Sequence, residues 1–196
     1  AAMKLTLEGE DSRLSRELSD ELFRIEQYVG MVLTYLRLGS ESSDYVFREY
    51  ELDEIVRGEV KKFAGQFIRR GIRLDFRPSG KRVVTDGKWL GFVIEQLLSN
   101  ALKYTRSGTI AIYVEEPLTL VIKDSGIGIA PEDIPRVFER GYTGGNGRGS
   151  SGSSGIGLWL CKRICGELGN SIGIESEPGV GTAVRVGLEK KVERFE

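Results

Sequence analysis

A carboxylate at the end of an apolar strand is the first feature that points to chemistry. Residues 118–124 are predicted to form a strand that ends in Asp124, and Gly126 and Gly128 follow at once. Because glycine has no Cβ, these positions allow a ligand or another backbone to come close. A Rossmann dinucleotide loop is a rival interpretation, but its fingerprint needs a third glycine opening a helix, and Ala130-Pro131 occupies that place. Two glycines alone are weak evidence for either interpretation.

A polar stripe on an otherwise apolar helix is the second feature. The helix predicted over residues 86–104 is apolar almost all round, which is typical of a buried helix. Gln96, Asn100 and Lys103 nevertheless share one face, at spacings of four and three residues. The stripe faces either water or a polar ligand, and the helix alone does not decide between the two.

The third feature is a glycine–serine tract over residues 141–155, followed by a predicted helix. A loop of this length inside a compact domain is usually a functional lid or a disordered linker. The free N–H groups and the positive dipole end of the following helix would attract phosphate. Arg140 beside the tract and Arg148 within it would add positive charge, although each arginine alone also fits a solvated surface position.

A glycine turn before the last strand completes the set. Residues 176–182 read Ser-Glu-Pro-Gly-Val-Gly-Thr. Taken alone, this segment predicts a tight structural turn between two strands. The order of the four motifs along the chain is therefore more informative than any one of them.

The elements that carry these motifs follow a helical segment, and the first predicted domain covers residues 1–40. Apolar side chains recur every three or four positions over residues 14–38, which predicts an amphipathic helix whose stripe needs a partner. Residues 3–7 are expected to end a preceding helix, with a turn between the two. This arrangement predicts part of a helical hairpin, and two hairpins make a four-helix dimer.

The second predicted domain covers residues 41–196 and is of the α+β class. Strands are expected over residues 45–52, 72–76, 81–85, 109–115, 118–124, 172–176 and 182–188, and helices over residues 53–70, 86–104, 131–138 and 156–168. This order favours a two-layer α/β sandwich, in which the helices cover one face of a single mixed sheet.

Composition excludes several classes of function. The 196 residues carry a net charge of −1, which gives no electrostatic footprint for nucleic acid. No apolar run in the sequence approaches the roughly 20 residues of a membrane span. There is no histidine, which excludes a Ser-His-Asp or Cys-His mechanism and, with only Cys161 and Cys165 present, a zinc site. The two cysteines are expected to be small buried apolar side chains of a reduced, cytosolic chain.

Taken in order, the four motifs resemble those of the histidine-kinase branch of the Bergerat-fold (GHKL) ATPases. The resemblance covers about residues 45–188, nearly the whole second domain. It implies the Bergerat ATPase fold, with ATP and Mg²⁺ as cofactors. It also implies a protein-histidine kinase of a two-component system, which passes the γ-phosphoryl group of ATP to a histidine and then to an aspartate of a response regulator.

The resemblance also implies roles for individual residues. Residues 95–104, Glu-Gln-Leu-Leu-Ser-Asn-Ala-Leu-Lys-Tyr, look like the N box of the family. By this resemblance Asn100 binds Mg²⁺ and Lys103 contacts phosphate, as the catalytic residues, and Asp124 accepts a hydrogen bond from the adenine amino group. The nucleotide-binding residues implied in this way are Gln96, Asn100, Lys103, Tyr104, Asp124, Gly126, Gly128, Ile129, Arg140, Arg148, Gly155, Ile156, Gly157, Leu158 and Thr182.

Two of these positions carry a physical prediction. A carboxylate buried at Asp124 would be left unpaired by a base without an amino donor, so we expect ATP to bind more tightly than GTP. Hydrolytic members of the superfamily have a glutamate four residues before the magnesium asparagine, where this chain has Gln96. Because glutamine cannot take a proton, we expect nucleotide to be held for transfer rather than hydrolysed rapidly.

The N-terminal part adds a finer resemblance. Residues 139–148, together with the helix over residues 22–38, are similar to small membrane-anchored kinases of the bacitracin-sensing type. This implies that the sequence begins a few residues past the phosphate-accepting histidine and is a cytoplasmic domain of a bacterial membrane-anchored sensor kinase. The expected partners are a response regulator and a second copy joined through the hairpin, with no nucleic acid and with the membrane reached only through preceding segments.

Two other functions remain open at this point. One is a non-catalytic, nucleotide-gated interaction module, which phosphorylation of a histidine-bearing hairpin in trans would exclude. The other is a clamp ATPase of the GHKL type, which measurable steady-state hydrolysis would favour despite Gln96.

Overall fold

The computed structural model describes residues 13–38, 45–147 and 154–189. The chain divides into two compact units, residues 1–44 and residues 45–196. The expected boundary between residues 40 and 41 falls in a segment outside the described residues. Each unit is therefore considered by itself.

A single long helix makes up the described part of the first unit. Helix α2 spans Arg13–Leu38, as the apolar periodicity predicts. Ile25, Val29, Val32 and Leu36 recur along it and are all more than half exposed. The expected preceding helix over residues 3–7 lies outside the described residues. Across the described part of the chain, no helix combines the length and apolar character that crossing a membrane requires.

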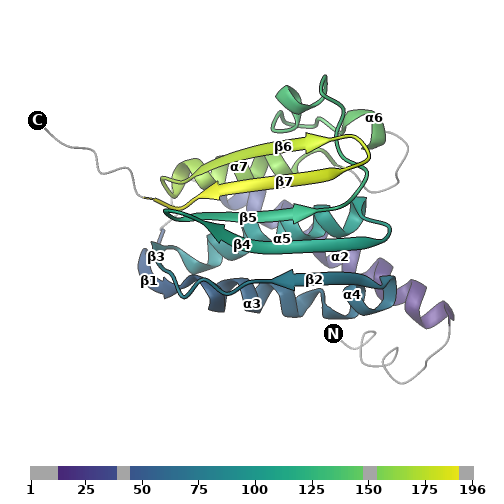
Figure 1. The fold of residues 1–196 in the computed structure, drawn as a ribbon, viewed down its shortest axis with the longest axis horizontal. Coiled ribbons are helices and arrows are strands. Elements are labelled where there is room, and N and C mark those ends of the chain that lie inside the picture. The colour runs from purple at the N-terminus through teal and green to yellow at the C-terminus, as the bar shows by residue number, and fades with distance from the viewer. Residues whose placement is uncertain (1–12, 39–44, 148–153, 190–196) are drawn as a thin grey trace, which may run out of the picture. The chain divides into compact units, whose positions relative to one another are not determined.

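A five-stranded mixed sheet forms one layer of the second unit (Figure 1). Its strands, in spatial order, are β2 (Ile72–Phe76), β4 (Gly108–Glu115), β5 (Thr119–Asp124), β7 (Gly181–Gly187) and β6 (Ser171–Glu177). Strands β2 and β4 run parallel, and the other neighbours pair antiparallel. The hairpin expected around Glu116-Pro117 is the β4–β5 connection.

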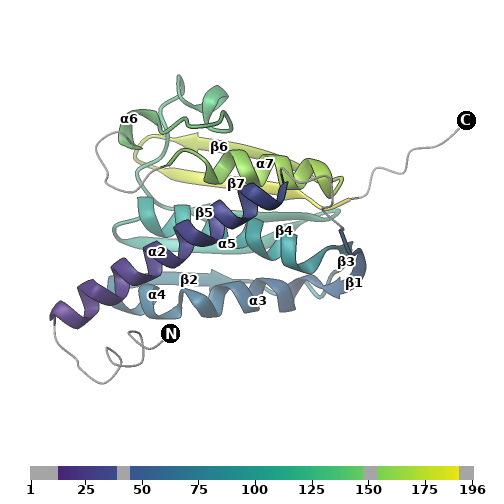
Figure 2. The ribbon, with the colours of Figure 1, turned by 180° about the vertical axis from the view of Figure 1, so that it is seen from behind.

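Four helices form the second layer, on one face of the sheet (Figures 1 and 2). They are α3 (Leu52–Lys62), α4 (Ala64–Arg70), α5 (Gly87–Tyr104) and α7 (Gly157–Glu167). Side chains from α5, α7 and the sheet that are at most 1% exposed fill the space between the layers, among them Leu90, Ile94, Leu98, Leu160, Ile164, Ile110, Ile112, Leu120 and Val186. The predicted α+β class and the two-layer sandwich are confirmed.

The expectation of a single sheet is wrong in one respect. Strands β1 (Arg48–Glu51) and β3 (Arg82–Thr85) pair with each other, antiparallel, as a separate ribbon. The carboxylate of Asp53 accepts hydrogen bonds from the backbone N–H groups of Ser79 (3.0 Å) and Gly80 (2.8 Å). This contact fixes the turn between β2 and β3, so that β3 meets β1 rather than the main sheet.

Two predicted helices also differ from the structure. The helix expected over residues 53–70 is interrupted at the buried Phe63, between α3 and α4, and ends at Gly71 in the left-handed conformation as predicted. The helix expected over residues 131–138 is reduced to the 3₁₀ turn η1, Ile134–Arg136. Pro135 accounts for this, because proline inside a helix removes a hydrogen bond and clashes with the preceding turn. A short helix that the sequence did not predict, α6, spans Gly144–Gly147, where the glycine content opposes helix formation.

Candidate nucleotide-binding site

The polar stripe lies in the second half of α5. This helix begins at a carboxylate cap, because Oδ1 of Asp86 accepts hydrogen bonds from the backbone N–H groups of Lys88 (3.0 Å) and Trp89 (3.2 Å). Its apolar faces are buried between α3, α7 and the sheet, which fixes its rotation and therefore the direction of the stripe.

The members of the stripe differ in burial. The side chain of Gln96 is only 4% exposed, whereas Asn100 one turn later is half-buried. The side-chain amide of Asn100 makes no hydrogen bond within the described part of the chain, so its oxygen is available to a ligand. At the last turn, the ammonium of Lys103 lies 5.4 Å from the ring centroid of Tyr104.

Asp124 is buried at the end of β5, on the side of the sheet that the helices cover. It lies opposite Thr182 on β7 and is 8% exposed. Burial raises the pKa of its carboxyl above the usual range, and hydrogen bonds from the backbone N–H groups of Gly126 (2.8 Å) and Thr182 partly offset this rise. The ionised carboxylate therefore sits in an environment that favours a further hydrogen-bond donor.

The glycine loop after Asp124 packs directly on the end of α5. The N–H of Ile127 donates to the carbonyl oxygen of Tyr104 at 3.1 Å. A Cβ on Gly126 would lie 2.5 Å from the same oxygen, so only glycine fits there. The structure thus joins the end of the polar stripe to the segment that carries Asp124.

The same loop also packs on the turn between β6 and β7. Gly128 has φ +71°, and a Cβ there would lie 2.1 Å from the carbonyl oxygen of Glu177. The N–H of Gly179 donates to the carbonyl of Ile127 at 2.9 Å, and the N–H of Ile129 donates to Oγ of Ser176 at 2.8 Å. Three motifs that are separate in sequence, at the end of α5, after β5 and before β7, therefore form one cluster.

The two ends of the glycine–serine tract, residues 141 and 155, lie next to each other. The N–H of Gly141 donates to the carbonyl oxygen of Gly155 at 2.9 Å. Gly155 has φ +66°, and a Cβ there would lie 2.4 Å from the carbonyl carbon of Gly141. Both features require glycine at position 155. A residue with a side chain rarely adopts this φ, and its Cβ would have no space. Arg148, which was expected to contact nucleotide, lies outside the described residues.

A polar cluster fixes the first residues of the tract. The hydroxyl of Tyr142 hydrogen-bonds to Oδ1 of Asp133, and the N–H of Gly145 donates to Oδ2 at 3.1 Å. The guanidinium of Arg136 lies 4.2 Å from the centroid of the Tyr142 ring. Sequence reasoning missed Asp133 and Tyr142, and the only signal was an aromatic residue at the start of a glycine tract.

The N-terminus of α7 follows the tract, and the described residues provide no side-chain cap for it. Ile156 is at the N-cap position, with Gly157 and Leu158 as the first residues of the helix. The N–H of Ile156 lies at the long distance of 3.4 Å from Oγ of Ser154. The guanidinium of Arg140 lies 5.7 Å from the ring of Trp159 in the first turn, which brings one expected phosphate contact to this end of the helix.

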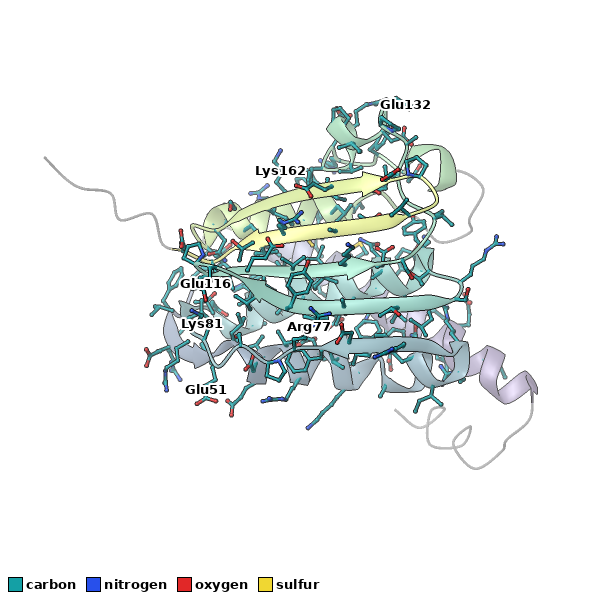
Figure 3. All side chains as sticks on the ribbon, in the orientation of Figure 1. Glu51, Arg77, Lys81, Glu116, Glu132 and Lys162 are labelled. Carbon is teal, nitrogen blue, oxygen red and sulfur yellow. The ribbon has the colours of Figure 1, made fainter. Side chains whose placement is uncertain are left out.

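The other face of the sheet has a different character (Figure 3). Arg77 lies there with its guanidinium 5.6 Å from the ring of Tyr113 on β4. Arg185 of β7 forms ion pairs with Glu115 (3.0 Å) and Glu175 (2.6 Å). These charges satisfy one another on the open face, whereas Asp124 and Thr182 point to the helical face.

Comparison with known proteins assigns the family. Residues 85–192 match the model of the histidine kinase-, DNA gyrase B-, and HSP90-like ATPases, and the chain belongs to this family. The chain is 35% identical over 185 residues to the sensor protein BceS of Bacillus subtilis, covering 92% of this chain and 55% of that protein. It is 36% identical over 197 residues to the sensor histidine kinase GraS of Staphylococcus haemolyticus, covering 98% and 57%. The resemblance to sensor histidine kinases is confirmed.

A solved structure shares the fold. The full-length ShkA in complex with AMPPNP aligns with a TM-score of 0.67 at 21% identity, over 88% of this chain and 36% of that chain. At this identity the likeness establishes the fold alone. The chain spans between 55% and 57% of the length of the two sensor proteins named above, so the activity of the whole protein is a matter for proposal.

Proposed function

We propose that this chain is the Mg²⁺-ATP-binding catalytic domain of a sensor histidine kinase. The activity would transfer the γ-phosphoryl group of ATP to a histidine, and from there to an aspartate of a response regulator. Family membership and the named sensor-kinase relatives support this class of reaction. The observation that carries the proposal is the buried carboxylate of Asp124, held by glycine-dependent contacts beside the polar end of α5.

The adenine base would bind at Asp124. The buried carboxylate of Asp124 accepts two backbone hydrogen bonds from the described residues, and it retains lone pairs for the exocyclic amino group of adenine. Guanine and hypoxanthine carry a carbonyl oxygen at position 6, where adenine has its amino group. This oxygen would face the carboxylate of Asp124 with no proton between them. Leaving buried polar groups unpaired costs more than losing an ordinary contact, so the site should discriminate strongly. Gly126, Gly128 and Ile129 would line the base, with Tyr104 as a further wall.

The triphosphate would lie between the end of α5 and the start of α7. The uncapped N–H groups of Gly157 and Leu158, after the tightly placed Gly155, suit an anion. Lys103 on α5 and Arg140 beside α7 would add positive charge.

Magnesium would be held chiefly by the nucleotide. Among the described residues there is no group of three or more His, Cys, Asp or Glu side chains suited to a metal. Mg²⁺ needs few protein ligands when phosphate oxygens and water complete its shell. The amide oxygen of Asn100, half-buried and without a hydrogen-bond partner among the described residues, fits the role of that protein ligand. The bound ion would neutralise phosphate charge.

Transfer rather than hydrolysis follows from the same helix. Gln96, one turn before Asn100, is buried, and its amide cannot act as a base toward water. Phosphoryl transfer depends mainly on positioning and charge stabilisation, which Asn100, Lys103 and the start of α7 would supply. The sequence has no histidine, so the acceptor would belong to a segment or chain other than this one.

The remaining elements fit a two-component kinase. The exposed apolar stripe of α2 would pack in a helical dimerisation hairpin, as part of a domain over residues 1–40 that precedes the catalytic domain over residues 41–196. The parent protein would be a membrane-anchored bacterial kinase whose cytoplasmic part contains this chain.

Calorimetric titration tests the proposal. Wild type should bind ATP in the presence of Mg²⁺, and Asn100→Ala should lose most of the magnesium-dependent gain in affinity while keeping binding of ATP in EDTA. Asp75→Asn, on the open face of the sheet, is a matched control that should bind like wild type. Equal effects of Mg²⁺ on wild type and Asn100→Ala would refute the role of Asn100.

Two assays separate kinase from the other functions. Incubation with γ-labelled ATP and a histidine-bearing hairpin should label the hairpin in trans at an acid-labile bond. Nucleotide binding without transfer would instead indicate an interaction module. Sustained phosphate release without a partner would indicate a clamp ATPase.

A further inference from the structure

The hydroxyl of Ser176 is at the centre of the adenine end of the site. It contacts three groups: the N–H of Ile129 at 2.8 Å, the carbonyl oxygen of Gly181 at 2.9 Å and Oγ1 of Thr182 at 2.9 Å. These partners come from the loop after β5 and from β7. Ser176 itself is the penultimate residue of β6, so one hydroxyl joins the three segments.

The direction of each hydrogen bond follows from the protons and lone pairs that each group has available. A serine hydroxyl has one proton to donate and two lone pairs to accept with. The carbonyl oxygen of Gly181 can only accept, so it takes the proton of Ser176. The N–H of Ile129 can only donate, so it uses one lone pair. In the contact with Thr182, Ser176 therefore accepts, and the proton of the Thr182 hydroxyl is committed to Ser176.

This assignment determines what Thr182 offers to a ligand. Because its proton is donated to Ser176, the hydroxyl of Thr182 can only accept a hydrogen bond from a ligand. Thr182 lies directly opposite Asp124 across β5 and β7, and its backbone N–H bonds to the carboxylate of Asp124. Both side chains would then offer only acceptors to the group at position 6 of the purine, so that group must be a donor, as the amino group of adenine is and a 6-oxo group is not.

We propose that Ser176 is a specificity-determining positioning residue, which holds the Thr182 hydroxyl as an acceptor beside Asp124 and so selects 6-aminopurine nucleotides. The inference rests on the proposed function and deepens it. Ser176 acts through Thr182 and need not touch the nucleotide. Without Ser176 the Thr182 hydroxyl would be free to rotate and donate to a 6-oxo group, and the discrimination would fall.

Inosine triphosphate is the sharpest probe, because its base has the adenine skeleton with an oxygen at position 6 and a proton on N1. The quantity to measure is the ratio of its dissociation constant to that of ATP, by calorimetry with Mg²⁺. Ser176→Ala should lower this ratio about threefold to tenfold, the equivalent of one hydrogen bond gained by the 6-oxo base. Ser176→Thr retains the hydroxyl and should keep the wild-type ratio.

A double-mutant cycle separates this role from a structural one. Thr182→Val removes the hydroxyl without removing the bonds of Ser176 to Ile129 and Gly181, and it should lower the ratio by itself. Adding Ser176→Ala to Thr182→Val should then leave the ratio unchanged. A residue that only held the loop in place would weaken both nucleotides in proportion, with no change in ratio.

The outcomes are distinct. Wild type that binds neither nucleotide overturns the proposed function and the inference with it. Wild type that prefers ATP, with an unchanged ratio in Ser176→Ala or in Thr182→Val, overturns the inference and leaves the proposed function standing. If Ser176→Ala does not fold, the ratio measured for Thr182→Val decides.

Discussion

The N-termini of α5 and α7 lie in the same helical layer, but their free backbone N–H groups have different surroundings. At α5, Oδ1 of Asp86 caps the first turn through Lys88 and Trp89, while Oδ2 accepts a hydrogen bond from the N–H of Val46 at 2.8 Å. At α7, Ile156 is at the cap position and offers no acceptor. Both ends carry the partial positive charge of a helix N-terminus. The protein itself completes one of these ends, and we propose that a bound phosphate completes the other.

The local backbone supports this contrast. The capped end continues directly from β3, whereas the uncapped end follows Gly155, whose φ of +66° and contact with Gly141 exclude a side chain. Arg140 lies against the first turn of α7, at Trp159. A polar carboxylate stabilises the first helix, and the second would gain the equivalent stabilisation only when phosphate binds.

The largest expected effect comes from making α7 resemble α5. Ile156→Asp would place a carboxylate where phosphate is proposed to bind. Repulsion between such charges in a partly solvated site should weaken Mg²⁺-ATP binding by about 1–3 kcal/mol, or about fivefold to 150-fold. Calorimetry measures this directly. Ile156→Asn, which can cap without charge, should weaken binding much less, and equal losses in both variants would count against a phosphate at this end.

The reverse change removes the cap of α5. Asp86→Ala should lower the free energy of unfolding by about 1–3 kcal/mol, because it loses a helix cap and leaves the N–H of Val46 without its acceptor. Urea denaturation measures the loss. Asp75→Ala, which removes a more exposed carboxylate paired with Arg77, should change stability little. The folded Asp86→Ala protein should still bind ATP, and a selective loss of affinity would contradict a purely structural role for this end.

A third prediction concerns the pH dependence that Asp124 confers. Burial raises its folded-state pKa above the unfolded value, so the ionised form costs stability. This cost appears as pH rises above the unfolded pKa and is complete above the folded pKa. Asp124→Asn should therefore be more stable than wild type near neutral pH, and the difference should vanish in acid below the unfolded pKa.

Thermal unfolding over a pH series checks the sign of this difference. The same variant should lose the preference for ATP over GTP, because a carboxylate acceptor is replaced by an amide that can also donate. A variant that is less stable than wild type at neutral pH would show that the carboxylate of Asp124 contributes net stability.

The smallest expected effect is at the start of the glycine–serine tract. Tyr142→Phe removes the hydroxyl bonded to Asp133 and keeps the ring beside Arg136. Nucleotide affinity should fall only about twofold to threefold, through loss of one partly buried hydrogen bond that orders the segment before α7. Titration with Mg²⁺-ATP measures it. A loss far beyond this range would mean that the hydroxyl contacts the nucleotide itself.

Local signals in the sequence predicted the framework of the site well. Asp86 before an apolar run marked the start of α5, and Gly71 marked the end of α4. Period-two and period-3.6 patterns were enough to place the strands of the main sheet and the helical layer. These features depend on neighbours in sequence, which is why the sequence could predict them.

Features set by contacts distant in sequence could not be predicted in this way. The β1–β3 ribbon depends on the bonds of Asp53 to a turn 26 and 27 residues away. The role of Ser176 depends on the β6–β7 register and on a loop 47 residues away, so the motif alone gave only a glycine turn. The proximity of the segment after Asp124 to the end of α5 likewise appears only in the folded chain.

A crystal structure of this chain with Mg²⁺ and an ATP analogue tests the central claim most directly. The account predicts that the exocyclic amino group of adenine lies within hydrogen-bond distance of the Asp124 carboxylate. It also predicts that the phosphates lie at the first N–H groups of α7, with the metal on the amide oxygen of Asn100. A nucleotide bound elsewhere, with Asp124 and the start of α7 both unoccupied by it, would contradict the account.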